Sequence, residues 1–413
     1  MERLGARIGG LTEAIALRGN IRVLALSSFM WGLYFSMLNV VLQPFTLSLG
    51  VSVVVLGILH SFGSRLGGLV ASLVQPLSGW LSDTRGRKLV VVLGSVVSLT
   101  FLSLFLLAAY TGSWIVLVPA YLFLGLSMLS SPATQSLAAE SVDVKKRTMA
   151  FSTISFFFLL PGAATTFVGG YLADAFGYPI IFLLGITLEA MNLGLVVLLL
   201  KETYSRPSER TRKEGLASFI RRALVPPPNL RGFYVAITAD AFSWGLGAYI
   251  LYGLLRAEFE FTNTEIGFVA GAFMTSFAAT QLPIGKLIER FGSKRSLVVS
   301  EALGIPLMLG WLSSTEVAPF ALLGILGGVI AASWGPAMQT ILVNSVPAED
   351  RGGGVGRLAA FRGLVSFPAP IIGGVLYERW GFWAPITAGI AGVIVTVFLL
   401  LFLVREPDSE IAR

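Results

Sequence analysis

The chain has 413 residues, of which 55% are hydrophobic and only 13% are charged, and its mean hydropathy is +0.79. Soluble proteins carry about 25% charged residues, so this composition overrides the two or three soluble domains that the length alone would suggest. The absence of cysteine excludes disulfides and thiolate metal sites, and a single histidine, His60, excludes a multi-histidine centre. We therefore expect no metal and no cofactor.

About twelve apolar stretches are long enough to cross a bilayer, which takes about 20 residues in a helix. The predicted spans of the first half are 21–46, 53–82, 88–110, 114–139, 148–173 and 178–200, and those of the second half are 231–256, 264–290, 294–314, 317–345, 353–378 and 382–404. The predicted fold class is therefore an all-helical integral membrane protein.

Basic residues cluster on one side of these predicted spans. They precede the first span and follow every even-numbered one, whereas the alternate loops hold few, with Arg256 and Arg379 as exceptions. The positive-inside rule then places both termini in the cytoplasm, with the bilayer of the cell membrane around the chain. The net charge of +7 does not indicate nucleic-acid binding, because the bases lie in these short loops. The predicted organisation is an N-terminal segment (1–20), a bundle (21–200), a linker (201–230), a second bundle (231–404) and a tail (405–413).

The loop after the second span has the pattern G-x-x-x-D-x-x-G-R-K. Its glycines allow a tight turn and a close approach of helices, and its charges must lie at the surface or in ion pairs. The pattern is made by Gly79, Asp83, Arg85, Gly86, Arg87 and Lys88, and a degraded copy after the eighth span by Gly285, Glu289, Gly292 and Lys294. We interpret the recurring loop as a gate that latches two halves together, rather than as a surface turn with solvated charges.

Other short segments also recur in register between the halves. Residues 169–174 (GGYLAD) recur as 373–378 (GGVLYE), residues 132–135 (PATQ) as 336–339 (PAMQ), and residues 31–33 (WGL) as 244–246. The sequence therefore predicts two parallel repeats of six spans, an arrangement that places a substrate site at the repeat interface near the middle of the membrane. We interpret the glycine pairs mainly as positions where helices pack closely.

The gate loop and its echo resemble the loops between helices 2 and 3 and between helices 8 and 9 of the major facilitator superfamily. The resemblance covers residues 20–405 and implies two pseudo-symmetric six-helix bundles that transport a solute by alternating access. The layout is similar to that of the twelve-helix drug/proton antiporter-like families. The resemblance also implies that Asp83 meets the start of span 11 near residues 352–354, that Glu140 or Asp143 pairs with Arg87, and that Glu289 lies near Thr148 and Met149.

Ionisable residues inside predicted spans are functional candidates, because burying a charge in the membrane is unfavourable. Arg65 lies deep in span 2, where its guanidinium is suited to hold a carboxylate or phosphate of a substrate, or to pair with a buried acid. Asp240 in span 7 is a proton-coupling candidate or a fixed partner of a base. Arg362 in span 11 is a second candidate for an anionic substrate, or pairs with Asp240 as a switchable contact between spans. Glu189 and Glu301 lie in spans expected at the periphery, so we expect them to be protonated or bonded to a neighbouring helix.

Uncharged polar and aromatic residues offer hydrogen bonds and ring faces to a small organic substrate, although many will join helices instead. The candidates for substrate binding are Trp31, Tyr34, Asn39, Gln135, Trp244 and Gln339, with Gln43 and Tyr249 beside them.

The leading prediction for function is a secondary transporter, proton-coupled and monomeric, for a small organic anion. Proton-driven export of hydrophobic or cationic compounds is the alternative. It is not the leading prediction, because Tyr121 and the separation of Pro161 from Gly169 depart from the drug antiporter pattern. A sensor or scaffold without transport is a second alternative. No catalytic constellation indicates an enzyme, and the absence of a G-x-x-x-x-G-K-[ST] loop argues against direct ATP coupling.

Overall fold

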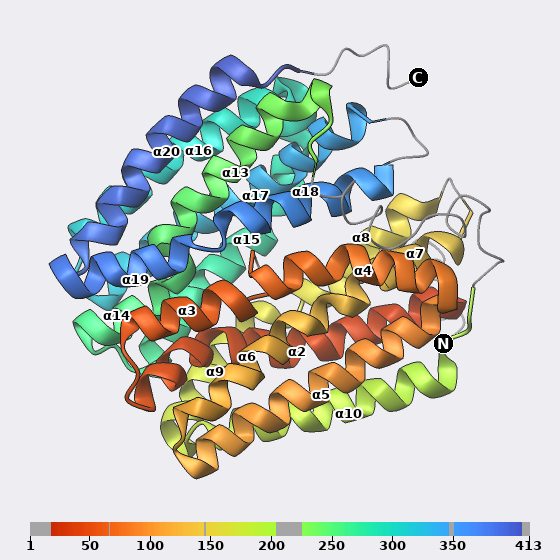
Figure 1. The fold of residues 1–413 in the computed structure, drawn as a ribbon, viewed down its shortest axis with the longest axis horizontal. Coiled ribbons are helices and arrows are strands. Elements are labelled where there is room, and N and C mark those ends of the chain that lie inside the picture. Colours follow the sequence, from red (N-terminus) through yellow and green to blue (C-terminus); the bar gives the residue numbers. More distant parts are fainter. Residues whose placement is uncertain (1–17, 66, 144–145, 204–224, 347–350, 407–413) are drawn as a thin grey trace, which may run out of the picture.

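The chain folds into two groups of helices that lie side by side (Figure 1), the first red to yellow-green and the second green to blue. The computed structural model describes residues 18–65, 67–143, 146–203, 225–346 and 351–406, with the side chains of residues 148 and 351–355 left out. Throughout these ranges the regular structure is helical and contains no strand, which confirms the predicted fold class.

The first half holds nine α-helices and two short 3₁₀ helices within the described ranges. They are α2 (Gly19–Ser48), α3 (Val53–Gly63), α4 (Leu69–Arg85), α5 (Arg87–Thr111), η1 (Trp114–Val116), α6 (Leu117–Leu126), η2 (Ser127–Leu129), α7 (Ser130–Glu140), α8 (Arg147–Leu159), α9 (Gly162–Phe176) and α10 (Pro179–Leu199).

The second half repeats this order with fewer interruptions. Its described elements are η4 (Pro228–Leu230), α13 (Arg231–Gly247), η5 (Ala248–Ile250), α14 (Leu251–Phe259), α15 (Asn263–Phe291), α16 (Ser293–Leu312), α17 (Val317–Asn344), α18 (Arg351–Ser366), α19 (Ala369–Trp380) and α20 (Trp383–Leu403).

Ten helical segments of the described chain are long and apolar enough to cross a membrane. The second and seventh spans are not among these ten segments and are formed by α3 with α4 and by α13 with α14. The end of the molecule where α4 ends and α5 begins, with residues 79–88, is here named the gate end, and the opposite end the far end (right and left in Figure 1). Since α2 ends at the far end and α5 begins at the gate end, α3 and α4 together make one crossing.

The breaks in these two spans were not anticipated from the sequence, which predicted uninterrupted stretches. In the second span α3 ends at Gly63, because Ser64 is already extended, and Gly67 in the connection to α4 has a φ of +78°, a left-handed conformation that glycine adopts without strain. In the seventh span Gly247 ends α13, and a single 3₁₀ turn follows before α14 begins. Apolar composition does not distinguish a continuous helix from two shorter ones, so the pattern of hydrophobicity did not reveal either break.

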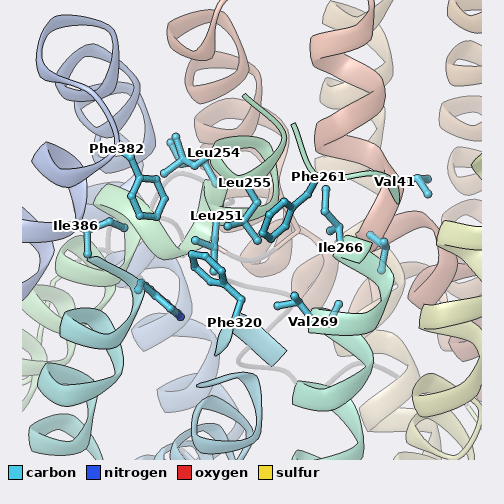
Figure 2. Packing of buried hydrophobic residues seen from close by; sticks show 14 of the residues in the cluster. Val41, Leu251, Leu254, Leu255, Phe261, Ile266, Val269, Phe320, Phe382 and Ile386 are labelled. Atoms are coloured by element: carbon cyan, nitrogen blue, oxygen red, sulfur yellow. The ribbon is translucent and has the colours of Figure 1, made fainter. Parts of the chain in front are cut away.

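The buried apolar side chains are joined across the halves at the far end. One cluster combines Val41 of α2 with Leu251, Phe261 and Phe320 of the second half (Figure 2). At the gate end, the cluster around Ile21 and Val90 belongs to the first half, and a separate cluster around Phe233 belongs to the second. The far end is therefore where the two halves share a common core in this conformation.

Candidate functional site

The gate loop turns at Gly86, whose φ of +109° lets α4 end and α5 begin with no intervening coil. The guanidinium of Arg87 contacts the Asp83 carboxylate one turn earlier and donates to Ser82 Oγ at 2.6 Å. Its Nη2 atom lies 3.0 Å from Glu140 Oε1 at the end of α7. Of the two partners of Arg87 that the resemblance implied, Glu140 makes the contact, and Asp83 finds its positive partner within its own loop.

The start of α5 is capped by an acid that the sequence did not single out. Glu202, just after α10, accepts hydrogen bonds from the backbone N–H groups of Arg87 (3.1 Å) and Lys88 (3.0 Å). The ammonium group of Lys88 in turn donates to the carbonyl oxygen of Val197, near the end of α10, at 2.8 Å. These bonds satisfy amides and carbonyls that helix ends leave unpaired.

The second copy of the loop has the same architecture. Glu406, just after α20, accepts from the N–H groups of Ser293 (2.6 Å) and Lys294 (3.1 Å), and Lys294 Nζ donates to the Leu401 carbonyl at 2.7 Å. The turn residue Gly292 has a φ of +90°. The signal for both acids was present in the sequence as a basic-acidic pair directly after the sixth and twelfth spans, at 201–202 and 405–406.

Two gate glycines lie apart from the turn. Gly79 and Gly285 are inside α4 and α15, and a Cβ atom at either position would meet no atom within 4 Å. The close approach predicted for these glycines is therefore not made in this conformation. The contacts implied for Asp83 with residues 352–354 and for Glu289 with Thr148 involve positions whose side-chain surroundings lie outside the described residues.

The C-terminal half contains a cluster of buried and partly buried charged and aromatic side chains. Arg362 Nη2 on α18 lies 3.1 Å from Asp240 Oδ2 on α13 and 3.3 Å from the hydroxyl of Tyr249 in η5. The Arg362 guanidinium also lies 4.7 Å from the ring centre of Trp334 on α17. Asp240 and Arg362 are thus brought together, and the broken span supplies their third partner.

Glu301 joins this cluster from α16, contrary to the expectation of a peripheral role. Its side chain is fully buried, accepts from Trp244 Nε1 at 3.4 Å and neighbours the Asp240 carboxyl group. Its Oε1 atom has no hydrogen-bond partner among the described residues. The expectation for Glu301 was wrong because it was based on the position of its span at the outside of the bundle. A long side chain on such a span can still point into the bundle.

The N-terminal half holds Arg65 at the break between α3 and α4, and this side chain is 8% exposed. Its Nε atom donates to Ser127 Oγ at 2.8 Å, and Nη1 finds no partner within the described chain. Its guanidinium carbon lies 5.2, 5.3 and 5.2 Å from the ring centres of Trp31, Phe35 and Phe101, which allows cation–π attraction. Arg65 therefore lies in the aromatic interior of the first half.

The remaining candidates separate into buried and exposed side chains. Tyr34 is buried at 1% exposure between Arg65 and Glu189 of α10, and Trp31 stacks near Phe158 with ring centres 4.5 Å apart. Three amides at the surface of the membrane-spanning helices are exposed: Asn39, Gln135 and Gln339. The structure does not gather these amides with Arg65 into one compact site.

Gln43 of α2 connects the first half to the broken seventh span. Its Nε2 donates to the Tyr249 carbonyl at 2.8 Å, and its Oε1 accepts from the Gly253 N–H, in the first turn of α14, at 2.8 Å. Its Nε2 also lies 3.2 Å from Nε2 of His60. Tyr249 therefore contacts Arg362 through its hydroxyl and the opposite half through its carbonyl.

Comparison with known proteins agrees with this architecture. The family model described as Major Facilitator Superfamily matches residues 24–255 and 233–413. The protein named multidrug resistance protein MdtG from Enterobacter lignolyticus (strain SCF1) is 25% identical over 395 residues, covering 93% of this chain and 90% of that protein. Its counterpart from Klebsiella pneumoniae (strain 342) is 25% identical over 410 residues, with 95% of each chain covered.

Solved structures share the fold at lower identity. The human organic anion transporter MFSD10 (TETRAN) is 18% identical with a TM-score of 0.70, covering 92% of this chain and 98% of its own. A D-xylose-proton symporter is 14% identical with a TM-score of 0.71, covering 94% and 98%. The repeated gate loop, the paired six-span halves and the family match over nearly the whole chain lead to one assignment: the chain belongs to the major facilitator superfamily of membrane transporters.

Proposed function

We propose that this protein is a proton-coupled antiporter that exports hydrophobic or amphipathic organic compounds, and that the carboxyl groups of Asp240 and Glu301 carry the proton. The observation that carries the proposal is the cluster of two buried carboxyl groups and one partly buried arginine, Arg362. Relatives named as multidrug resistance proteins at 25% identity support this class of substrate.

The charge balance of this cluster favours a shared proton. Two ionised carboxylates beside one guanidinium leave one buried negative charge uncompensated, which is unfavourable in a low-dielectric interior. One proton between Asp240 and Glu301 removes that charge and gives the unpaired Oε1 of Glu301 a hydrogen to donate. Protonation also weakens the ion pair between Asp240 and Arg362, so the two events are linked.

Tyr249 provides a physical connection from the proton site to the interface of the halves. Its hydroxyl bonds Arg362, and its carbonyl bonds Gln43 of the other half. A change in the Asp240–Arg362 pair would therefore alter a residue that also contacts α2. This arrangement gives proton uptake a route to bias alternating access.

The rest of the transport path has the chemistry of a site for organic compounds. Exposed amides in membrane-spanning helices are unfavourable against lipid, so Asn39, Gln135 and Gln339 are best placed along a water-filled cavity between the halves. Trp31 and Trp244 offer aromatic faces. The distribution of basic residues supports a gate end in the cytoplasm of a cell-membrane protein, which we propose to act as a monomer of two bundles, 21–200 and 231–404.

Substrate-driven proton flux in proteoliposomes tests the proposal. Addition of a lipophilic cation to one side is expected to move protons the other way in the parent protein. Asp240→Asn and Glu301→Gln should each reduce this flux at least tenfold while purified protein still binds the cation. Glu189→Gln, a buried carboxyl change in the first half, is the matched control and should retain coupling. Undiminished coupling in both cluster variants would overturn the assignment of the proton site.

The pair of Asp240 and Arg362 has its own test. Exchange of the two residues in the double variant Asp240→Arg/Arg362→Asp should restore part of the transport that each single change removes. Failure of the exchange to restore any transport would contradict a role that depends on the pair alone.

Uptake or export of a small organic anion is a second candidate, favoured by the unpaired Nη1 of Arg65. A ligand that binds the folded state raises its thermal stability by mass action. If organic anions stabilise the parent but not Arg65→Ala, the anion hypothesis gains and the drug hypothesis loses. Stabilisation by cationic or hydrophobic compounds alone, unchanged in Arg65→Ala, would make Arg65 a structural residue.

A further inference from the structure

The recurring segments 169–174 and 373–378 lie at the far end, on α9 and α19. The first glycine of each packs within its own half, because a Cβ at Gly169 would meet Met37 of α2 and one at Gly373 would meet Leu246 of α13. The second glycine packs against the opposite half. A Cβ at Gly170 would collide with the Asn263 carbonyl, and one at Gly374 would lie 2.7 Å from the Val53 carbonyl.

Each segment ends in an acid four residues after the second glycine. Asp174 Oδ1 accepts from the Asn263 backbone N–H (3.2 Å) and from its side-chain amide (2.7 Å). Asp174 Oδ2 accepts from the Thr264 N–H (2.7 Å) and hydroxyl (2.6 Å). Asn263 and Thr264 are the first two residues of α15, which belongs to the other half.

The same contact recurs with the halves exchanged. Glu378 Oε1 accepts from the backbone N–H of Val54 at 2.9 Å, and Val54 is the second residue of α3 in the first half. The contact is sparser than that of Asp174, which has four hydrogen bonds.

The two helix starts are each completed by both halves. Helices begin with unpaired N–H groups, and the aligned peptide dipoles favour a negative charge there. In α15 the N-cap residue Thr262 takes the N–H of Glu265, and in α3 Ser52 takes that of Val55 at 3.4 Å. Asp174 and Glu378 accept hydrogen bonds from the N–H groups that these local caps leave unpaired. Each acid is thus a cap supplied from across the interface.

We propose that Asp174 and Glu378 are a far-end latch: positioning residues that hold the two halves together at this end and must release α15 and α3 whenever it opens. The second glycines bring the acids into range, and the acids provide the bonds that separation breaks. The inference rests on alternating access in the superfamily and is independent of the proton-coupled export proposed above.

Conformational populations measured with spin labels test the latch. The chain has no cysteine, so Thr111→Cys and Ser313→Cys place one label at the far end of each half, on exposed positions of α5 and beside α16. Asp174→Ala is expected to raise the population with a long inter-label distance by about three- to tenfold, the range for losing a helix cap. Glu378→Ala should give a smaller rise, and the double variant the largest.

Glu316→Ala is the matched control, because Glu316 is an exposed acid that precedes α17 at the same end and makes no side-chain cap bond. It should leave the distance distribution unchanged. A distribution in the Asp174 and Glu378 variants that matches the parent would overturn the proposal.

A cross-link keeps the inference testable if the alanine variants fold poorly. Asp174→Cys/Thr264→Cys places two thiols where the acid and its partner now meet. Oxidation should block transport, and a reductant should restore it. Full transport by the oxidised, cross-linked protein would show that this contact does not separate in the cycle and would refute the latch. The spin-label and cross-link results do not depend on proton coupling. The latch and the proposed proton-coupled export can therefore fail separately.

Discussion

The gate end and the far end use the same chemical contact for different purposes. At both ends an acid accepts hydrogen bonds from the first N–H groups of a helix. At the gate end, Glu202 and Glu406 belong to the same half as the helices they cap. At the far end, Asp174 and Glu378 belong to the opposite half. The within-half caps at the gate end move as one body with their half, whereas the cross-half caps at the far end break when the halves separate.

The apolar cores follow the same division. A shared cluster joins α2 to the second half at the far end, and separate clusters occupy the gate end of each half. Open space surrounds Gly79 and Gly285 at the gate end, whereas Gly170 and Gly374 are closely packed. This conformation is therefore held closed at the far end. We expect substitutions at cross-half contacts to change conformational populations, and substitutions at within-half contacts to change stability.

The largest effect is expected from filling the far-end contact. Gly170→Val adds atoms where the Asn263 carbonyl lies, so the far end cannot close and transport in proteoliposomes should fall about tenfold or more. Gly194→Val is the control, because a Cβ at this position on α10 meets nothing within 4 Å. Equal transport in both variants would contradict the tight cross-half packing.

A second comparison uses two buried amides of the same helix. Gln43→Leu leaves the Tyr249 carbonyl and the Gly253 N–H without their partner across the interface, each worth about 1–3 kcal/mol when buried. Far-end spin labels should then report a larger open population, by roughly tenfold. Asn20→Leu removes bonds to Ser141 and Lys201 within the first half and should lower the melting temperature without that shift. If both variants shifted the open population equally, the distinction between cross-half and within-half contacts would be contradicted.

Asp83→Asn addresses the gate loop itself. The resemblance places this acid against the start of α18, across the interface, when the gate end closes, so removing its charge should weaken the state in which the gate end is closed and the far end open, by about threefold. Labels placed across the gate end would measure the population. Unchanged populations would mean that Asp83 only fixes the local turn, as the surface-turn interpretation holds.

The smallest conformational effect is expected from the within-half caps. Glu202→Gln and Glu406→Gln should each cost about 0.5–2 kcal/mol of stability, the range for a lost helix cap. For a chain of this size that corresponds to a melting temperature lower by roughly 1–4 °C. The far-end distance distribution should match the parent. A large shift in that distribution would show that these acids also sense the opposite half.

The sequence was sufficient where a contact is local or repeated. The gate turn at Gly86 follows from the pattern of glycines and charges in one loop. Glu140 is one of the two partners for Arg87 that the family resemblance implied, and the pairing of Asp240 with Arg362 is one of the two alternatives that the sequence left open. The same reasoning treated Gly170 and Gly374 as packing positions, because a repeat reveals which residues recur but not which half they touch. Glu301 was assigned to the periphery because the order of spans fixes the position of a helix but not the direction of a side chain. The helix breaks after Gly63 and Gly247 depend on backbone geometry that hydrophobicity does not report.

The excess of carboxyl groups around Arg362 bears on how the membrane potential would act on the transport cycle. With one proton bound, the cluster of Asp240, Glu301 and Arg362 is neutral, and without it the cluster carries one negative charge. If that charge moves through the membrane field as the halves rock, the electrical potential acts on one state of the cycle and not on the other. A full unit charge crossing 100 mV corresponds to about 2.3 kcal/mol. Exchange of one proton for an uncharged compound would then be electrogenic, and exchange for a monovalent cation would be electrically silent.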